Sequence, residues 1–212
     1  MEIILWIIAF AVTITVHEAA HAWMADRLGD PTARLDGRLS LNPLVHYDRI
    51  GSTILIVTAI LTALRFFPFP FGWAKPVQID PYNLAKPRRD AALISIAGPL
   101  TNLVLATVLS IVVRLLPGTI AFYIFYPTIM LNIALAVFNL VPIHPLDGGK
   151  VLVGILPHKE AVELDLFLNR YGMLLLVFLI FPIFGGISLV SSIIGPVIGM
   201  IIGLLLPGAV LI

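Results

Sequence analysis

The sequence predicts an all-α polytopic membrane protein, and composition and hydropathy lead to that fold class. Of its 212 residues 59% are hydrophobic and only 12% are Asp, Glu, Lys or Arg, where soluble domains average about 45–50% and about 25%. So few charges could not cover that much apolar surface in water. The lipid bilayer is therefore the expected environment, and a net charge of +1 gives no sign of a nucleic-acid partner.

The apolar runs define the expected elements in chain order. The run 3–24 is interpreted as a retained span, since no basic segment precedes it as in a signal peptide. Runs of spanning length, about 20 residues, follow at 91–113, 120–141, 166–184 and 187–206, with turns at 114–118 and 185–186. The polar stretches between them are too short to fold alone. We expect one integral-membrane domain over 1–212, with its core at about 1–150 and a C-terminal helical pair at about 166–206.

His17, Glu18 and His21 form a His-Glu-x-x-His pattern inside the first run. Residues four apart share a helix face, so both imidazoles can bind one metal ion while Glu18 serves as general base. Ionisable groups inside a span cost on the order of 2.5 kcal/mol or more unless paired or metal-bound, so they mark a functional site. Catalytic zinc usually takes three protein ligands. Because the chain has no cysteine, Asp147, in a Pro- and Gly-rich turn after the run 120–141, fits the third position.

Two further motifs accompany this pattern, and together the three resemble the site-2 protease family in its compact form without PDZ or CBS domains. They are Gly98-Pro-x-x-Asn102 and Asn139-x-x-Pro142-x-x-Pro145-Leu146-Asp147-Gly148. The resemblance implies an intramembrane zinc metalloprotease that hydrolyses peptide bonds within or near the membrane spans of other proteins. One zinc ion would be held by His17, His21 and Asp147, with Glu18 as base. Asn139 would position substrate or stabilise the oxyanion, or else form an interhelical hydrogen bond.

Four polar residues are secondary candidates: Asn102, His46, Asp48 and His144. The pair His46-x-Asp48 lies in a polar loop and is either a gating pair or a structural turn. His144 stands where relatives mostly carry an apolar residue or proline, and is either an alternative ligand, a pH-sensitive neighbour or a nearby interfacial side chain. The proline-containing segment 72–78 is expected to be a short, membrane-associated extended or β segment near the active site. Its free backbone groups would capture unwound substrate by strand addition.

The run 51–67 is expected to be a re-entrant helix. His17 and Asp147 must meet at one depth, and the runs 91–113 and 120–141 already supply two crossings between them. Without a third crossing, twelve of the thirteen Lys and Arg residues lie on the side of the site, with Arg114 opposite. The positive-inside rule then places zinc nearer the cytoplasmic face of a prokaryotic cell membrane, with the N-terminus outside. The sequence predicts no oligomeric state.

Two other classes of protein compete with this interpretation. A zinc-binding scaffold that cleaves nothing would have no use for the base Glu18. A transporter would use intramembrane His and Asp residues as an ion path, but here they gather at one depth. Cleavage of a membrane-spanning substrate with and without a chelator distinguishes the three.

Overall fold

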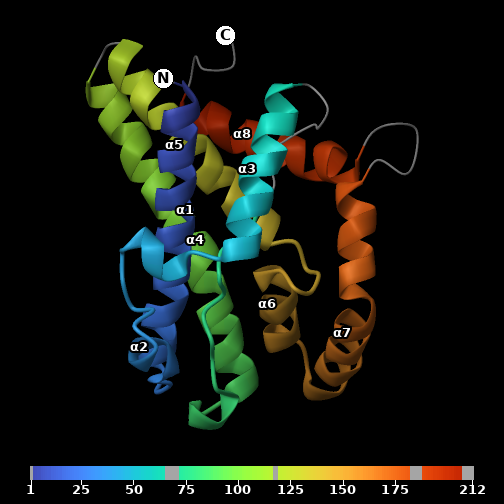
Figure 1. Ribbon diagram of the computed structural model, residues 1–212. Helices are drawn as coiled ribbons and strands as arrows, with labels where there is room; N and C mark the ends of the chain where they lie inside the picture. The colour runs from blue at the N-terminus through green and yellow to red at the C-terminus, as the bar shows by residue number, and fades with distance from the viewer. Residues whose placement is uncertain (1, 65–71, 117–118, 182–187, 207–212) are drawn as a thin grey trace.

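The computed structural model describes residues 2–64, 72–116, 119–181 and 188–206, and within these ranges all regular secondary structure is helical (Figure 1). The predicted all-α class is confirmed. The α-helices are α1 Glu2–Arg27, α2 Thr32–Leu35, α3 Arg49–Ala63, α4 Pro87–Leu115, α5 Thr119–Asn139, α6 Asp147–Ile155, α7 His158–Ile180 and α8 Gly195–Leu205. Short 3-10 helices cover η1 Pro43–His46 and η2 Pro81–Asn83, and a π-helical turn covers η3 Val190–Ile194.

Three of the described helices are long and apolar enough to cross a membrane: α1 from Ile4, α4 and α5. They correspond to the expected runs 3–24, 91–113 and 120–141, so the chain is an integral membrane protein. The run 166–184 lies mostly in α7, which begins earlier and carries charged residues in its first turns. In the run 187–206 the structure has η3 followed by the 11-residue α8, which crosses the direction of α1 in Figure 1. The expected turn at 185–186 and residues 117–118 lie outside the described residues.

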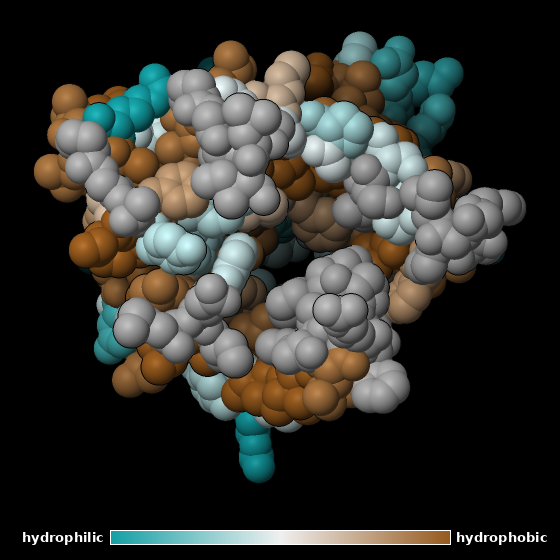
Figure 2. Space-filling view, turned by 90° about the horizontal axis from the view of Figure 1, so that it is seen from above, coloured by the Kyte–Doolittle hydropathy of each residue, from teal (hydrophilic) through white to brown (hydrophobic). Residues whose placement is uncertain are grey.

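Helix α4 lies at the centre of the bundle and packs against α1, α5 and α6, while α8 covers part of α4 and α5. The buried apolar side chains of α1 and α4 are mostly small, among them Ala9, Ala19, Ala22, Ala25, Ala92 and Ala97. Small residues let membrane helices approach closely, because lipid provides no hydrophobic drive for their association. Many large apolar side chains face outward instead. Figure 2 shows them around the rim of the end seen from above.

After α3 the chain returns to the start of that helix. A methyl group added to Gly51, near the start of α3, would overlap the backbone carbonyl of Trp73, and one added to Gly72 would overlap Leu55. Residues 51 and 72 therefore lie side by side, although 65–71, which include most of the expected proline-rich return, lie outside the described residues. From Gly72 to Asp80 the chain is neither helix nor strand, so the expected extended or β segment forms no β-strand there. The Lys75 amide donates to the His46 carbonyl at 3.0 Å.

Asp30 joins the loop after α1 to the loop before α4. It is fully buried and accepts hydrogen bonds from Thr32, from the Asn83 side chain and from the Asp80 amide. Burial by itself would raise the pKa of Asp30, but these hydrogen bonds outweigh it and hold that pKa below its ordinary value. The ionised carboxylate therefore fixes the two loops at the end of the bundle where α4 begins.

Candidate metal centre

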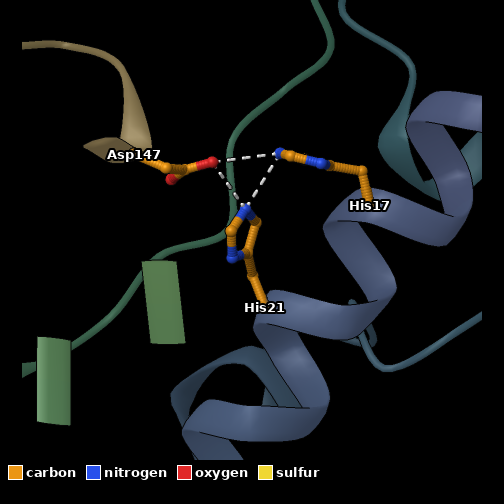
Figure 3. Close-up of side chains that lie close together, drawn as sticks. All are labelled: His17, His21 and Asp147. Atoms are coloured by element: carbon orange, nitrogen blue, oxygen red, sulfur yellow. Dashed lines mark hydrogen bonds and ion pairs between the residues drawn. The ribbon is translucent and has the colours of Figure 1, made fainter. Parts of the chain in front are cut away.

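His17, His21 and Asp147 converge on one point between α1 and α6 (Figure 3). The Oδ2 atom of Asp147 lies 3.2 Å from Nε2 of His17 and 3.3 Å from Nε2 of His21, and the two Nε2 atoms are 3.0 Å apart. The imidazoles come from successive turns of α1, whereas Asp147 begins α6, where the helix dipole favours a carboxylate. The two histidines lie four positions apart in the sequence, and Asp147 follows His21 by 126 positions. The fold brings the three side chains together.

The other ring nitrogen of each histidine is already engaged. His17 Nδ1 lies 2.6 Å from Oδ1 of Asn102, and His21 Nδ1 lies 2.7 Å from the backbone carbonyl of Ile94. A carbonyl oxygen only accepts, so each Nδ1 carries a proton and donates it. In the neutral imidazole the Nε2 atom then presents a lone pair, which is the form that binds a metal.

The donor set fits zinc. Two lone pairs and an ionised carboxylate cannot lie this close without a cation or extra protons between them. Zinc binds histidine nitrogen at about 2.0–2.1 Å in tetrahedral sites, which places its ligand atoms roughly 3.3 Å apart. A carboxylate binds zinc in its ionised form, so Asp147 supplies an anionic oxygen beside the two neutral imidazoles.

Gly98 on α4 makes room for both imidazoles. A Cβ atom at this position would lie 2.5 Å from Nε2 of His21 and 2.7 Å from Cε1 of His17, far inside van der Waals contact. The next residue, Pro99, has no N–H for the helical bond to the carbonyl of Ser95, and Ser95 also lines the site. The Gly-Pro pair therefore lets α4 pass directly behind the metal position.

Glu18 faces a cavity of about 160 Å³ beside the three ligand atoms. Its Oε2 accepts a hydrogen bond of 3.2 Å from the Val77 amide, so the segment 72–80 runs next to the expected base. Asn139 also lines this cavity, although its Nδ2 donates to the Leu135 carbonyl of its own helix at 3.0 Å. Its amide oxygen makes no hydrogen bond within the described structure and remains available to a bound molecule.

The remaining secondary candidates lie apart from the ligand cluster. Asp48, one residue before α3, accepts a 2.6 Å hydrogen bond from the Gly51 amide in the first turn of that helix. His46 donates through Nε2 to the Ser40 carbonyl at 2.9 Å. This geometry is that of the structural turn. His144 contacts Asp165 of α7 at 3.0 Å through Nε2 and is not in the group of possible ligands.

Sequence reasoning missed several groups that the structure brings to the site. The Ile94 carbonyl has no sequence signature, because every residue carries one. Lys150 lines the cavity, and its position three residues after Asp147 on one helix face was a usable signal. Thr13 and Asn132 are buried polar residues within apolar spans, a feature that by itself points to a functional site.

A buried His-His-Asp cluster with a neighbouring glutamate, carried by helices long enough to cross a bilayer, defines a membrane-embedded metalloprotease. The chain belongs to peptidase family M50, whose sequence model matches residues 5–123 and 117–179.

Curated relatives agree with this membership. YwhC of Bacillus subtilis, named as a zinc metalloprotease, is 34% identical over 163 residues, which cover 71% of this chain and 68% of that protein. Rip2 of Mycolicibacterium smegmatis, also named as a zinc metalloprotease, is 34% identical over 154 residues, or 68% of this chain and 54% of its own length. The stage IV sporulation protein FB of Bacillus subtilis is 29% identical over 160 residues, or 72% and 53%. No solved structure matches significantly. The chain is thus a zinc metalloprotease.

Proposed function

We propose that the protein hydrolyses peptide bonds within or near the membrane spans of other membrane proteins. In this proposal one zinc ion is held by His17, His21 and Asp147, and Glu18 is the general base. The observation that carries it is the convergence of three ligand atoms within 4.8 Å of one another, inside a bundle of membrane-spanning length. A metal site at this depth favours substrates that reach it within the membrane.

The chemistry follows from the groups around the cavity. Zinc bound here supplies an acidified water and polarises the scissile carbonyl. Glu18 accepts the proton of the attacking water and passes it to the leaving amine. The Val77 amide, 3.2 Å from Oε2, fixes the carboxylate so that it faces the cavity. The side-chain amide of Asn139 positions the substrate backbone or the developing oxyanion.

A substrate helix must unwind before it can react, because its amides and carbonyls are bonded within the helix. The segment 72–78 offers replacement partners. The amides of Lys75 and Val77 bond inward, to the His46 carbonyl and to Glu18. The amides of Ala74 and Gln78 make no hydrogen bond in the described structure, so this edge can pair with an unwound stretch of substrate by strand addition.

In the proposed topology α3 enters the bilayer without crossing it, and the chain returns to the side from which α3 entered. The contact between residues 51 and 72 supports a re-entrant helix, since a crossing would separate these positions by the thickness of the bilayer. The basic residues near the start of α4 and α7 lie together, with Arg88 3.4 Å from His158, and Arg114 lies at the opposite end of α4. We therefore place the zinc nearer the cytoplasm and the N-terminus outside.

The number of crossings and the domain boundaries complete the proposal. Helix α7, with 23 residues, rises about 35 Å and is long enough for a fourth crossing. A fifth crossing over 187–206 stays a prediction, because α8 rises only about 16 Å. We treat 1–212 as one protease domain, with the catalytic core at about 1–150 and the C-terminal pair at about 166–206.

Cleavage of a model membrane-spanning substrate in detergent or liposomes tests the proposal. Native protein is expected to cut it, a chelator to stop cleavage and added zinc to restore it. The Glu18→Gln variant should bind zinc but lose about 10²–10⁴-fold in rate, because the amide cannot accept the water's proton. Undiminished cleavage by that variant would exclude Glu18 as base, and undiminished cleavage after zinc removal would exclude the metal mechanism.

A further inference from the structure

A buried set of polar side chains extends from His17 into the membrane-spanning core. It consists of Thr13 on α1, Asn102 on α4 and Asn132 on α5, which are 2%, 0% and 0% exposed. Polar groups at such positions are costly unless every donor and acceptor is paired. The arrangement that pairs every donor and acceptor among them is therefore strongly favoured in energy. The direction of each hydrogen bond can be worked out from the backbone carbonyls, which can only accept.

The orientation of Asn132 is fixed by its own helix. Its Nδ2 lies 2.7 Å from the backbone carbonyl of Thr128 and 2.8 Å from Oγ1 of Thr13. The carbonyl of Thr128 can only accept, so the NH₂ group of the amide must face it. The amide oxygen of Asn132 consequently faces Asn102.

The orientation of Asn102 is set by two acceptors, the backbone carbonyl of Thr13 and the amide oxygen of Asn132. Its Nδ2 donates to the backbone carbonyl of Thr13 at 3.1 Å and to Oδ1 of Asn132 at 2.6 Å, so both of its N–H groups are used. Its Oδ1, 2.6 Å from Nδ1 of His17, can only accept. His17 must therefore carry its proton on Nδ1, and its Nε2 lone pair faces Asp147 and His21.

We propose that Asn132 is a positioning residue that selects the metal-binding tautomer of His17 by fixing the amide orientation of Asn102. The inference rests on the proposed function, because it concerns the same metal site. Asn132 itself contacts neither a metal ligand nor the reacting atoms. Without Asn132, only the longer 3.1 Å bond to the Thr13 carbonyl holds the Asn102 amide, so a larger fraction of molecules has the amide turned to donate to an unprotonated Nδ1. The His17 proton then lies on Nε2, where it blocks the metal.

The two ligands differ in how their tautomers are set. His21 donates directly to a backbone carbonyl, that of Ile94 at 2.7 Å, and needs no further support. His17 donates to a side-chain amide, which could point either way, so its tautomer depends on the groups behind that amide. The dependence on Asn132 is therefore specific to His17.

Zinc affinity, measured by competition with a chromogenic chelator, and the ring ¹⁵N spectrum of histidine-labelled metal-free protein test the proposal. Asn132→Leu should weaken zinc binding by about 10-fold to 100-fold, as for other outer partners of metal ligands. In the same variant the fraction of His17 protonated on Nδ1 should fall, while the His21 signal stays. The matched control is Ser110→Ala, which removes a buried hydroxyl that bonds only within α4 and should leave both measurements unchanged.

A double-mutant comparison separates positioning from a general structural role. If Asn132 acts through Asn102, then Asn132→Leu should cause no further loss of zinc affinity when Asn102→Leu is already present. Equal losses in both backgrounds, or native zinc affinity in Asn132→Leu, would overturn the proposal. Should Asn132→Leu fail to fold, Asn132→Ala removes the same amide with a smaller side chain, and native affinity with an unchanged His17 spectrum there would overturn the proposal equally. The proposed function fails separately, if zinc-loaded native protein does not cleave a membrane-spanning substrate, and that result leaves the tautomer measurements unaffected.

Discussion

Substituting Gly98 by alanine tests the close passage of α4 behind the metal site. The added Cβ atom would lie 2.5 Å from Nε2 of His21, where ordinary contact begins at 3.4 Å. Either the imidazoles or α4 must therefore yield by about 0.9 Å, since atoms at such distances repel steeply. A side chain cannot relieve the clash by rotating, because the position of a Cβ atom is set by the backbone.

The size of the effect follows from what this displacement disrupts. If α4 retreats, the contact between His17 and Asn102 lengthens from 2.6 Å to about 3.5 Å, beyond the hydrogen-bond range of about 3.2 Å. The contact between His21 and the Ile94 carbonyl lengthens similarly. If the imidazoles retreat instead, they leave the metal position. Loss of one such partner typically lowers metal affinity 10–100-fold, so we expect zinc binding at least about tenfold weaker.

The assay is zinc competition against a chelator of known affinity, with thermal unfolding in detergent alongside. Overpacking of this kind costs about 1–3 kcal/mol in stability, partly offset by about 1 kcal/mol because alanine favours helix over glycine. Gly199→Ala in α8 is the matched control, since nothing lies within 4 Å of its added Cβ, and it should bind zinc normally. Native zinc affinity in Gly98→Ala would refute the packing argument.

Three further predictions concern the third ligand, the loops and the topology. Asp147→Ala should lose zinc, whereas His144→Ala should keep stoichiometric zinc and lose only stability, because His144 bonds to α7 rather than to the metal site; metal analysis of both variants decides. The depressed pKa of Asp30 means that its stabilising effect is present above about pH 4 and is lost as pH falls through the lowered pKa; unfolding temperatures of native protein and Asp30→Asn should therefore differ most near neutral pH and converge in acid. In cysteine mapping, which the absence of native cysteine simplifies, an impermeant thiol reagent should reach replaced positions from the cytoplasmic face at Ser40 and Arg89 but from outside at Ile120.

Each of these has a contrary outcome. Zinc retained by Asp147→Ala and lost by His144→Ala would make His144 the ligand. A difference between native protein and Asp30→Asn that grows in acid would contradict the direction of the pKa shift. Labelling of position 89 from outside would show that 51–67 crosses the bilayer, and the proposed edge at 72–78 would then no longer run beside the zinc.

Local features of the sequence determined much of this protein. The first three spans follow from hydropathy, because a helix in lipid needs about 20 apolar residues and little else. The pairing of His17 with His21 follows from the helical repeat, which places residues four apart on one face. Asp147 could be singled out because it lies in a Pro- and Gly-rich turn directly after the run 120–141. None of these inferences requires knowing how the helices pack.

Only the tertiary structure decided the partners behind the ligands. The Ile94 carbonyl at His21, the Val77 amide at Glu18 and the amide of Asn132 behind Asn102 join groups far apart in the chain. Backbone donors and acceptors are the same at every residue, so no pattern of side chains marks which will be used. Which side chains meet depends on the rotation and depth of each helix, and these are set by the packing of α1, α4 and α5 together.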